Sequence, residues 1–367
     1  MFVDYSNSIL TYVSSIRNYF GLDSSYKSNA DFDEVLKDKK PKNIFLILID
    51  AMGANLIERK LPEDSFVRRN MLYKTSTVFP ATTTAATTSI RNGKAPNENG
   101  WLGWTQYIKE LDDVIIPFLG VSYYKENVSY GGRSYMHSLV PVTDTETELN
   151  DMGIAARKLF PSFEEDGCEN FDTMCNRLIG YSKNDTYRYV YAYWDKYDTY
   201  MHEYGTDDSV CDTYLAYINA QLERLSKSIS NDTMLVVVAD HGQITVGDIY
   251  NLYNSKYDKY FRHLPALETR AQAFYIKEGM LEEFEEEFRK DFSDRFVLLS
   301  HKEVVDSHLF GDFENHPKFE EYIGDYLAIA KTNMCFAYEI KKGFKLKGHH
   351  AGLCDDELMI PVIVYQR

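Results

Sequence analysis

Two apolar runs that each end in an aspartate constrain the fold of this 367-residue chain more than any other feature. Residues 42–49 read KNIFLILI and precede Asp50, and residues 234–239 read MLVVVA and precede Asp240. A continuous run of this kind predicts a strand that is buried on both faces, as in a parallel sheet. Such a sheet needs a layer of helices on each face.

Other segments of the chain extend this pattern. Residues 187–194 (YRYVYAYW) and 360–365 (IPVIVY) predict two more strands, and residues 51–60 and 210–228 predict helices between strands. Strands that alternate with helices are typical of an α/β fold. We therefore expect a mainly parallel sheet with helices on both faces.

We expect one domain over residues 1–367, with two insertions. Residues 101–185 are aromatic and rich in predicted loops. Residues 265–320 read as strand, helix, strand and helix, which predicts a small α/β insertion subdomain. No linker rich in proline, serine or glycine separates these stretches from the rest of the chain.

Charge and cysteine content exclude several classes of partner and compartment. The chain has 40 basic and 56 acidic residues, a net charge of −16, which disfavours binding to a nucleic-acid polymer or to an anionic membrane surface. Five scattered cysteines without a CxxC pair indicate a reducing compartment. The first 20 residues do not resemble a secretory signal, and no apolar run reaches the roughly 18 residues of a membrane span. We expect a cytoplasmic protein.

Four short polar segments lie at or near the predicted strand ends. Taken alone, each segment has an ordinary interpretation. Asp50 could be a turn residue or helix cap, Asp198 and His202 an exposed helix pair, Asp240 and His241 a strand-ending turn, and His349 and His350 surface histidines. In open α/β sheets, however, the carboxyl ends of strands are where sites form. The segments contribute Asp50, then Asp198 with His202, then Asp240 with His241, and finally His349 and His350 in KGHHAG.

Three carboxylates and three imidazoles at one sheet edge form an oxygen and nitrogen ligand set that suits zinc. Six ligands exceed the needs of one tetrahedral ion, so the set predicts two ions. Two ions about 4 Å apart can hold both the attacking and the leaving oxygen of a displacement at phosphorus.

A nucleophile is available in the threonine-rich segment FPATTTAATTSI, residues 79–90. A hydroxyl at a helix N-terminus lies beside free backbone N–H groups and the positive end of the helix dipole, which favour phosphate. The segment also fits an unreactive helix cap. Spacing alone leaves Thr82, Thr83 and Thr84 open.

Five segments in a fixed order carry a family resemblance: LILIDAMG, STVFPATTTAATTSIRNGKAPNENG, WDKYDTYMHEYG, VVVADHGQ and KGHHAG. Together they extend from about residue 42 to the C-terminus. In these segments the chain resembles the alkaline phosphatase superfamily, and within it the nucleotide pyrophosphatase/phosphodiesterase (type I phosphodiesterase) branch. The resemblance implies an alkaline-phosphatase-like fold and a metal-dependent hydrolase of phosphodiester or pyrophosphate bonds in small, nucleotide-like molecules.

The same resemblance implies residue roles. Thr83, three positions after Pro80, is the implied nucleophile and forms a phospho-threonine intermediate. Two divalent ions are implied, with zinc expected and manganese as the alternative. The implied ligands are Asp50, Asp240, His241 and Thr83 for one ion, and Asp198, His202 and His350 for the other. His349 is the alternative to His350, which fits better because a small residue, Ala351, follows it.

The chain departs from the family at one position. Family phosphodiesterases carry an asparagine about twenty residues after the nucleophile, and Trp104 stands there in this chain. The donor to the phosphoryl oxygen is therefore missing or is replaced, for example by the indole N–H. Trp101 and Trp104 could stack a flat part of the substrate, although core packing is the more common role of such rings.

Other activities remain open at this stage. No CxPxR motif supports a sulfatase, and no arginine stands beside Thr83 to hold a monoester dianion. The alternatives are a phosphomonoesterase, a phosphonate hydrolase, a phosphomutase-like enzyme or a metal-stabilised binding protein without turnover. We make no prediction of the oligomeric state.

Overall fold

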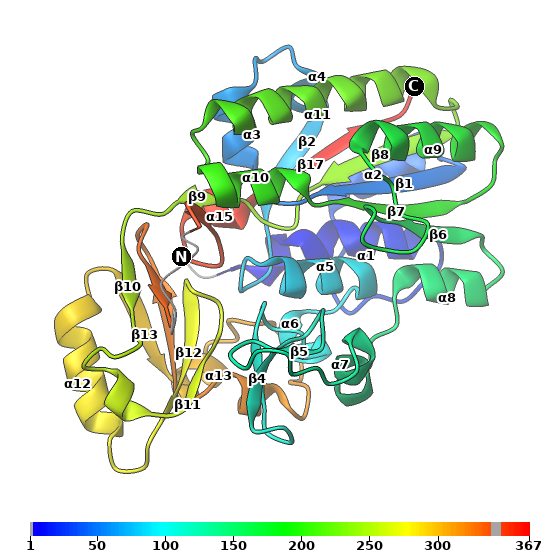
Figure 1. The fold of residues 1–367 in the computed structure, drawn as a ribbon. Helices are drawn as coiled ribbons and strands as arrows, with labels where there is room; N and C mark the ends of the chain where they lie inside the picture. Colours follow the sequence, from blue (N-terminus) through cyan, green and yellow to red (C-terminus); the bar gives the residue numbers. More distant parts are fainter. Residues whose placement is uncertain (1–2, 339–345) are drawn as a thin grey trace.

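A six-stranded sheet forms the centre of the computed structural model, which describes residues 3–338 and 346–367 (Figure 1). Its strand order is β2-β17-β8-β1-β7-β6. The strands β6, β7, β1 and β8 are parallel, whereas β17 is antiparallel to both β8 and β2. The predicted mainly parallel sheet is confirmed. Its strands are β1 (Asn43–Ile49), β2 (Met71–Ser76), β6 (Ala156–Leu159), β7 (Tyr189–Trp194), β8 (Thr233–Val238) and β17 (Met359–Tyr365).

The four predicted strands are β1, β7, β8 and β17, and the two strands that were not predicted lie at the sheet edges. β1 is buried at every position because it lies between β7 and β8 and is covered on both faces. β2 (MLYKTS) alternates between partly buried and exposed residues up to the buried Thr75, and β6 (ARKL) has only four residues. Neither edge strand has the continuous apolar run that marks a central strand.

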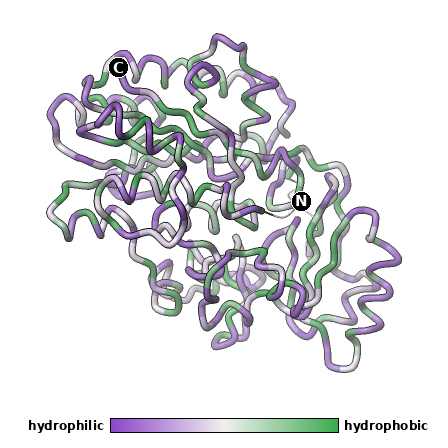
Figure 2. The backbone as a smooth tube through the Cα atoms, turned by 180° about the vertical axis from the view of Figure 1, so that it is seen from behind, coloured by the Kyte–Doolittle hydropathy of each residue, from purple (hydrophilic) through white to green (hydrophobic). Residues whose placement is uncertain are grey.

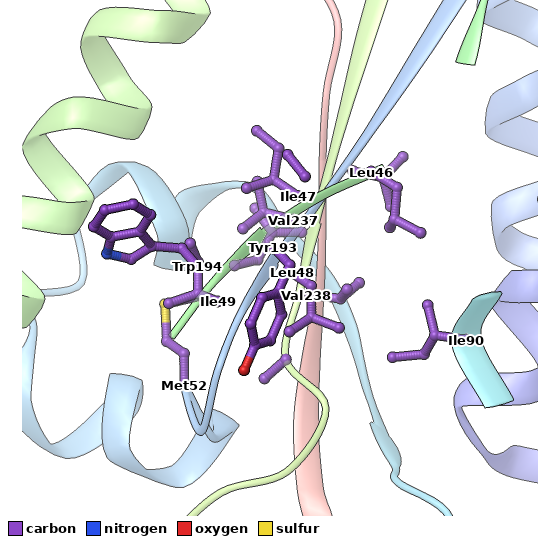
Figure 3. Close-up of a cluster of buried hydrophobic side chains, with 14 of the residues drawn as sticks. Leu46, Ile47, Leu48, Ile49, Met52, Ile90, Tyr193, Trp194, Val237 and Val238 are labelled. Carbon is purple, nitrogen blue, oxygen red and sulfur yellow. The ribbon is translucent and has the colours of Figure 1, made fainter. Parts of the chain in front are cut away.

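Helices cover both faces of this sheet (Figure 1). Figure 3 shows Ile90 approaching the core of β1, β7 and β8 from one face and Met52 and Trp194 lying toward the other. Each such side chain, when fully buried, contributes about 1.5–3 kcal/mol to folding. One face carries α1 (Ile9–Tyr19), α2 (Ala30–Lys39), α5 (Thr83–Asn92) and α8 (Thr145–Asp151); the other carries α3 (Ala54–Lys60), α4 (Phe66–Arg69), α9 (Phe171–Lys183), α10 (Lys196–Tyr204) and α11 (Ser209–Ser228).

A second, antiparallel sheet lies beside the first in the order β11-β12-β14-β13. Helix α12 buries a stripe of Phe284, Phe288 and Phe292 in the hydrophobic cluster that this sheet contributes to. The sheet includes β14, which lies beyond the predicted boundary at residue 320. The insertion subdomain over 265–320 therefore stays a prediction about domain boundaries. The elements of this region are β11 (Phe261–Leu267), β12 (Ala271–Ile276), α12 (Leu281–Phe292), β13 (Phe296–Ser300), α13 (His301–Asp306) and β14 (Tyr326–Ala330).

The stretch 101–185 begins with a small antiparallel sheet of β3 (Gln106–Ile108), β4 (Asp113–Ile116) and β5 (Val121–Ser122), followed by α7 (Arg133–Leu139). It then continues into α8, β6 and α9, which belong to the main α/β layers. An insertion over the whole of 101–185 therefore also remains a proposal.

Hydrophobic segments gather along the interior strands, and hydrophilic ones occupy much of the surrounding loops and helices (Figure 2). Among the described residues, no helix has the length and apolar character needed to cross a membrane. The remaining short elements are η1 (Tyr5–Asn7), α6 (Pro96–Asn99), β9 (Ile244–Thr245), β10 (Ile249–Asn251), η2 (Asp258–Tyr260), α14 (Phe319–Tyr322), β15 (Cys335–Ala337), β16 (Gly348–His349) and α15 (Asp355–Leu358).

Candidate active site and metal centre

The first cluster of ligand-type side chains forms where β1 and β8 end side by side. Leu48 and Val238 are partners in the parallel register, so Asp50 and Asp240, each two residues further on, leave the same edge of the sheet. Asp240 Oδ1 accepts hydrogen bonds from the backbone N–H groups of Ala51 (3.1 Å) and His241 (3.0 Å). These bonds hold the two strand ends together.

The donor atoms of Asp50, Asp240 and His241 lie within 4.8 Å of one another, and all three residues are buried. His241 Nε2 is 3.4 Å from Asp50 Oδ1 and 3.7 Å from Asp240 Oδ2. Neither of these two oxygens has a hydrogen-bond partner among the described residues. Burial and the neighbouring carboxylate of Asp240 raise the pKa of Asp50 well above its usual range. Two buried oxygens without partners fit a bound cation.

The second cluster comprises Asp198 and His202 of α10 and His350, whose donor atoms also lie within 4.8 Å of one another. His202 Nε2 is 3.3 Å from Asp198 Oδ2, and Gln243 Nε2 donates to Asp198 Oδ1 at 2.9 Å. Although burial opposes ionisation, His202 lowers the pKa of Asp198 overall. The rings of His241 and His350 stack at 3.9 Å, so the two clusters adjoin.

The three histidines of the clusters share one arrangement. Nδ1 of His241 donates to Gly242 O (2.9 Å), that of His202 to Gly348 O (2.7 Å) and that of His350 to Ala81 O (2.9 Å). This assignment of the proton leaves each Nε2 with a free lone pair, as a metal-binding imidazole requires. His349 differs, because its Nδ1 is 3.2 Å from the Thr269 hydroxyl and it lies outside the cluster.

Thr83 is the threonine that faces the first cluster. It is the first residue of α5, and its Oγ1 lies 3.2 Å from His241 Nε2. Thr82 Oγ1 instead donates to Glu268 Oε1 (2.5 Å), and the hydroxyl of Thr84 is buried without a hydrogen-bond partner among the described residues. Geometry thus singles out Thr83 among the three hydroxyls.

A cavity of about 530 Å³ opens beside Thr83. Trp104 lines it with a side chain that is 40% exposed, whereas Trp101 is fully buried and donates its indole N–H to Val140 O at 3.1 Å. The structure therefore brings Trp104 to the cavity, and Trp101 to the core.

Several residues near this site were not identified from the sequence. The Tyr193 hydroxyl donates to Asp50 Oδ2, and Asp195 lines the cavity. Glu268 accepts from the Trp104 backbone N–H at 2.6 Å, and burial raises the pKa of this carboxyl to about 7. Arg91 and Arg133 line the cavity away from Thr83. Two of them had a signal in the sequence. Asp195 directly follows the predicted strand 187–194, and Arg91 lies eight residues after Thr83 on a predicted helix.

Comparison with known proteins agrees with this geometry. The family model of type I phosphodiesterase / nucleotide pyrophosphatase matches residues 44–352. No curated protein sequence matches the chain significantly. Solved structures with a similar fold include murine ectonucleotide pyrophosphatase / phosphodiesterase 5, with a TM-score of 0.68, 15% identity and coverage of 87% of each chain.

Two further structures carry small ligands. An inactive form of the same murine protein in complex with AMP has a TM-score of 0.67 and 14% identity, covering 88% of this chain and 87% of that one. Phosphonoacetate hydrolase from Sinorhizobium meliloti 1021 in complex with phosphonoformate has a TM-score of 0.62 and 13% identity, covering 88% and 90%. At these identities the similarity shows a shared fold. Because the family model spans most of the chain and both ligand clusters, the protein belongs to the type I phosphodiesterase / nucleotide pyrophosphatase family.

Proposed function

We propose that this protein hydrolyses phosphodiester or pyrophosphate bonds in small molecules, with two divalent metal ions and Thr83 as the nucleophile. One observation carries the proposal: two adjoining clusters of metal-ligand type lie beside a hydroxyl at a helix N-terminus. Family membership supports the same reaction class.

In this proposal Asp50, Asp240, His241 and Thr83 hold one ion, and Asp198, His202 and His350 hold the other. The mixed imidazole and carboxylate donors favour zinc, with manganese as the alternative. When bound, the ions supply a lower pKa for the Thr83 hydroxyl and stabilise charge on the attacking and leaving oxygens.

Thr83 Oγ1 attacks phosphorus in line, and the bond to the leaving alcohol or phosphate breaks. The backbone N–H groups at the start of α5 face the phosphoryl oxygens and favour their negative charge. Water then attacks phosphorus of the phospho-threonine, which releases the phosphoryl product and restores the hydroxyl.

Trp104 stands where family phosphodiesterases carry an asparagine that contacts the phosphoryl oxygen, so the substrate class needs a direct test. Its backbone N–H is engaged by Glu268, and its ring lies at the cavity. The phosphonate hydrolase is the second candidate, because a phosphonoacetate hydrolase with bound phosphonoformate shares the fold. The test compares hydrolysis of bis(p-nitrophenyl) phosphate, p-nitrophenyl phosphate and phosphonoacetate, with zinc or manganese added. A dominant rate with either of the last two would reject the diesterase.

The nucleophile is tested by Thr83→Ala, which we expect to lower kcat by about 10³-fold or more while the zinc content stays near that of the wild type. Thr84→Val is the matched control, because the neighbouring hydroxyl that it removes has no hydrogen-bond partner among the described residues. Full activity of Thr83→Ala would remove Thr83 from the mechanism. Absence of turnover by the wild type, with stability lost on chelation, would favour a metal-stabilised binding protein.

The net charge and the state of the cysteines bear on the ligand and on the cellular compartment. We propose a small phosphate ester as the ligand, rather than a nucleic-acid polymer or a membrane, because the net charge is −16. All five cysteines are free and four are buried, which supports the cytoplasm as the compartment.

A further inference from the structure

The cavity beside Thr83 extends along one face of α5. Thr83, Thr87 and Arg91 stand at positions i, i+4 and i+8 of this helix, and all three line the cavity. Eight residues of helix span about 12 Å. Because helical side chains lean toward the N-terminus, the Arg91 guanidinium lies closer to Thr83 than that. The helix thus separates a reacting end from a distant, basic end of one cavity.

Arg133 of α7 joins Arg91 at the basic end. It forms no hydrogen bond or ion pair with the part of the chain that the structure describes, and its Nε is buried without a partner. Its guanidinium lies 4.9 Å from the centre of the Phe118 ring and 5.8 Å from that of Trp101. An arginine held by its flat face on aromatic rings keeps its N–H edge available for a planar anion.

Arg91 has one edge engaged and one edge free. Its Nε donates to Glu146 (3.2 Å) and its Nη2 to Glu146 (3.1 Å) and Asp144, whereas Nη1 donates to no described residue. Asp144 and Glu146 line a neighbouring cavity of about 400 Å³, which Arg91 also lines, and they do not line this one. Both acids therefore balance the charge of Arg91 without lining the cavity beside Thr83.

Charge is consequently distributed unevenly along the cavity. The reacting end holds Asp50, Asp195 and Asp198, and the distant end holds Arg91 and Arg133. Glu164 also lines the cavity, but it is exposed and forms no ion pair with either arginine. Burial and the charge of Arg91 lower the pKa of Arg133, and the charges of Asp144 and Glu164 offset this only in part. A bound anion would relieve the remaining penalty.

We propose that Arg133 and the free Nη1 edge of Arg91 form a second anion site, which binds a carboxylate or phosphate group at the far end of the substrate. This inference rests on the proposed function and narrows its substrate class to small phosphodiesters with a second anionic group about 10 Å from the reacting phosphorus. Arg91 lies eight residues along α5 from Thr83, and Arg133 of α7 lies close enough to Arg91 to feel its charge. The pair therefore holds the distant group and not the reacting phosphoryl group.

The test uses p-nitrophenyl phosphodiesters whose second ester group is an alkyl chain ending in carboxylate, phosphonate or hydroxyl. Chain lengths span about 6 to 12 Å to match the helix spacing. The readout is the ratio of kcat/KM for each anionic probe to that for the hydroxyl probe of equal length. In the wild type we expect a ratio of about tenfold to a hundredfold, as for a charge-assisted hydrogen bond pair. The carboxylate and phosphonate arms distinguish the two sources of the anion.

Arg133→Gln should lower this ratio several-fold toward one, with the remainder due to Arg91, and Arg133→Lys should leave an intermediate ratio because it keeps the charge without the two-pronged geometry. Arg91 stays intact, since its removal would leave Asp144 and Glu146 without their cation. The matched control is Arg289→Gln on α12, which removes one exposed positive charge and should keep the wild-type ratio. A wild-type ratio near one, or an unchanged ratio in Arg133→Gln, would overturn the proposal. An equal fall for all probes in Arg133→Gln would also overturn it, because it would indicate contact with the reacting phosphoryl group or a structural role.

Affinity measurements with probes that cannot be hydrolysed test the anion site independently of the proposed reaction. Alkylphosphonates with the same three ends lack the scissile ester, so calorimetric titration of the zinc-loaded protein reports affinity without turnover. If the wild type hydrolyses no diester but still prefers the anionic ends through Arg133, the reaction is wrong and the anion site stands. If diesters are hydrolysed and neither the rates nor the affinities show the preference, the site is wrong and the reaction stands.

Discussion

The two ligand clusters differ in depth and in charge balance. Asp50, Asp240 and His241 are at most 2% exposed and combine two carboxylates with one imidazole. In the second cluster the Asp198 and His202 side chains are 15% and 19% exposed, and two imidazoles accompany one carboxylate. The first cluster therefore leaves negative charge uncompensated in the absence of a cation, whereas Asp198 already has partners in His202 and Gln243. If cations bind as proposed, a cation should stabilise the first cluster more strongly than the second and should dissociate from the second cluster more readily.

Of the substitutions that compare the two clusters, removal of a side chain of the second cluster should have the largest effect. We expect His350→Ala to lower kcat by about 10²- to 10³-fold and the zinc content to one ion per chain, because the remaining Asp198 and His202 form an incomplete site. Activity and bound zinc are measured on the same preparation.

His349→Ala is the matched control, since it removes the adjacent imidazole, which contacts Thr269 and lies outside the cluster. It should retain both ions and most of the activity. If His349→Ala loses an ion and His350→Ala does not, the assignment of the late histidine is reversed.

The next effect concerns stability without metal, where Asp50 and Asp198 should respond to pH in opposite directions. Burial raises the pKa of Asp50, as does the charge of Asp240. A carboxyl with a raised folded-state pKa stabilises the fold below its unfolded pKa, and this contribution is lost as pH rises through the folded-state pKa. Asp198 has a lowered pKa, so its contribution is present above the unfolded pKa and is lost as pH falls.

Asp50→Asn tests the expected direction of the pH dependence of stability. In metal-free protein at pH 8 we expect it to increase the free energy of unfolding by about 1–3 kcal/mol, because the folded protein must bury the Asp50 carboxyl either as an uncompensated charge or with a proton that the unfolded chain does not bind at this pH. With saturating zinc the same substitution should be destabilising, because a ligand is lost. Urea unfolding at pH 5 and pH 8, with and without chelator, measures both. Destabilisation of the metal-free protein at pH 8 would show that the first cluster is already balanced without a cation.

The parts of this site that the sequence predicts are those whose positions follow from regular geometry. Asp50 and Asp240 follow central strands, and the parallel register of β1 and β8 brings them together. Asp198 and His202 share a face of α10 through their spacing of four residues. The resemblance selects His350 over His349, and the two side chains do have different surroundings, since His350 lies in the second cluster and His349 contacts Thr269.

Residues contributed by other parts of the chain could not be predicted in this way. Glu268 comes from the turn between β11 and β12, and Arg133 from the loop-rich stretch after β5. Their proximity to Thr82 and to α5 depends on how separate layers pack, which carries no periodic signal. The same reason explains why the edge strands β2 and β6 were missed, since half-exposed short strands lack a continuous apolar run.

The smallest effects should come from the side chains that support the ligands, and they compare the two clusters directly. Tyr193 donates to Asp50 in the first cluster, and Gln243 donates to Asp198 Oδ1 at 2.9 Å in the second. Outer partners of this kind orient the ligand oxygen, and their removal typically costs about 10- to 100-fold in metal affinity. We expect Tyr193→Phe to weaken the tighter zinc site and Gln243→Leu the weaker one, each leaving the other site near its wild-type affinity.

Zinc titration against a competing chelator resolves the two sites and measures each variant. Because Asp50 lies in a buried, carboxylate-rich cluster, the tighter site should lose less affinity in Tyr193→Phe than the weaker site loses in Gln243→Leu. Gln243→Leu should cost activity as well, since the more exposed ion then dissociates at working zinc concentrations. If Gln243→Leu instead weakened the tighter site, the assignment of tight binding to the buried cluster would be wrong, and depth would not be what distinguishes the two.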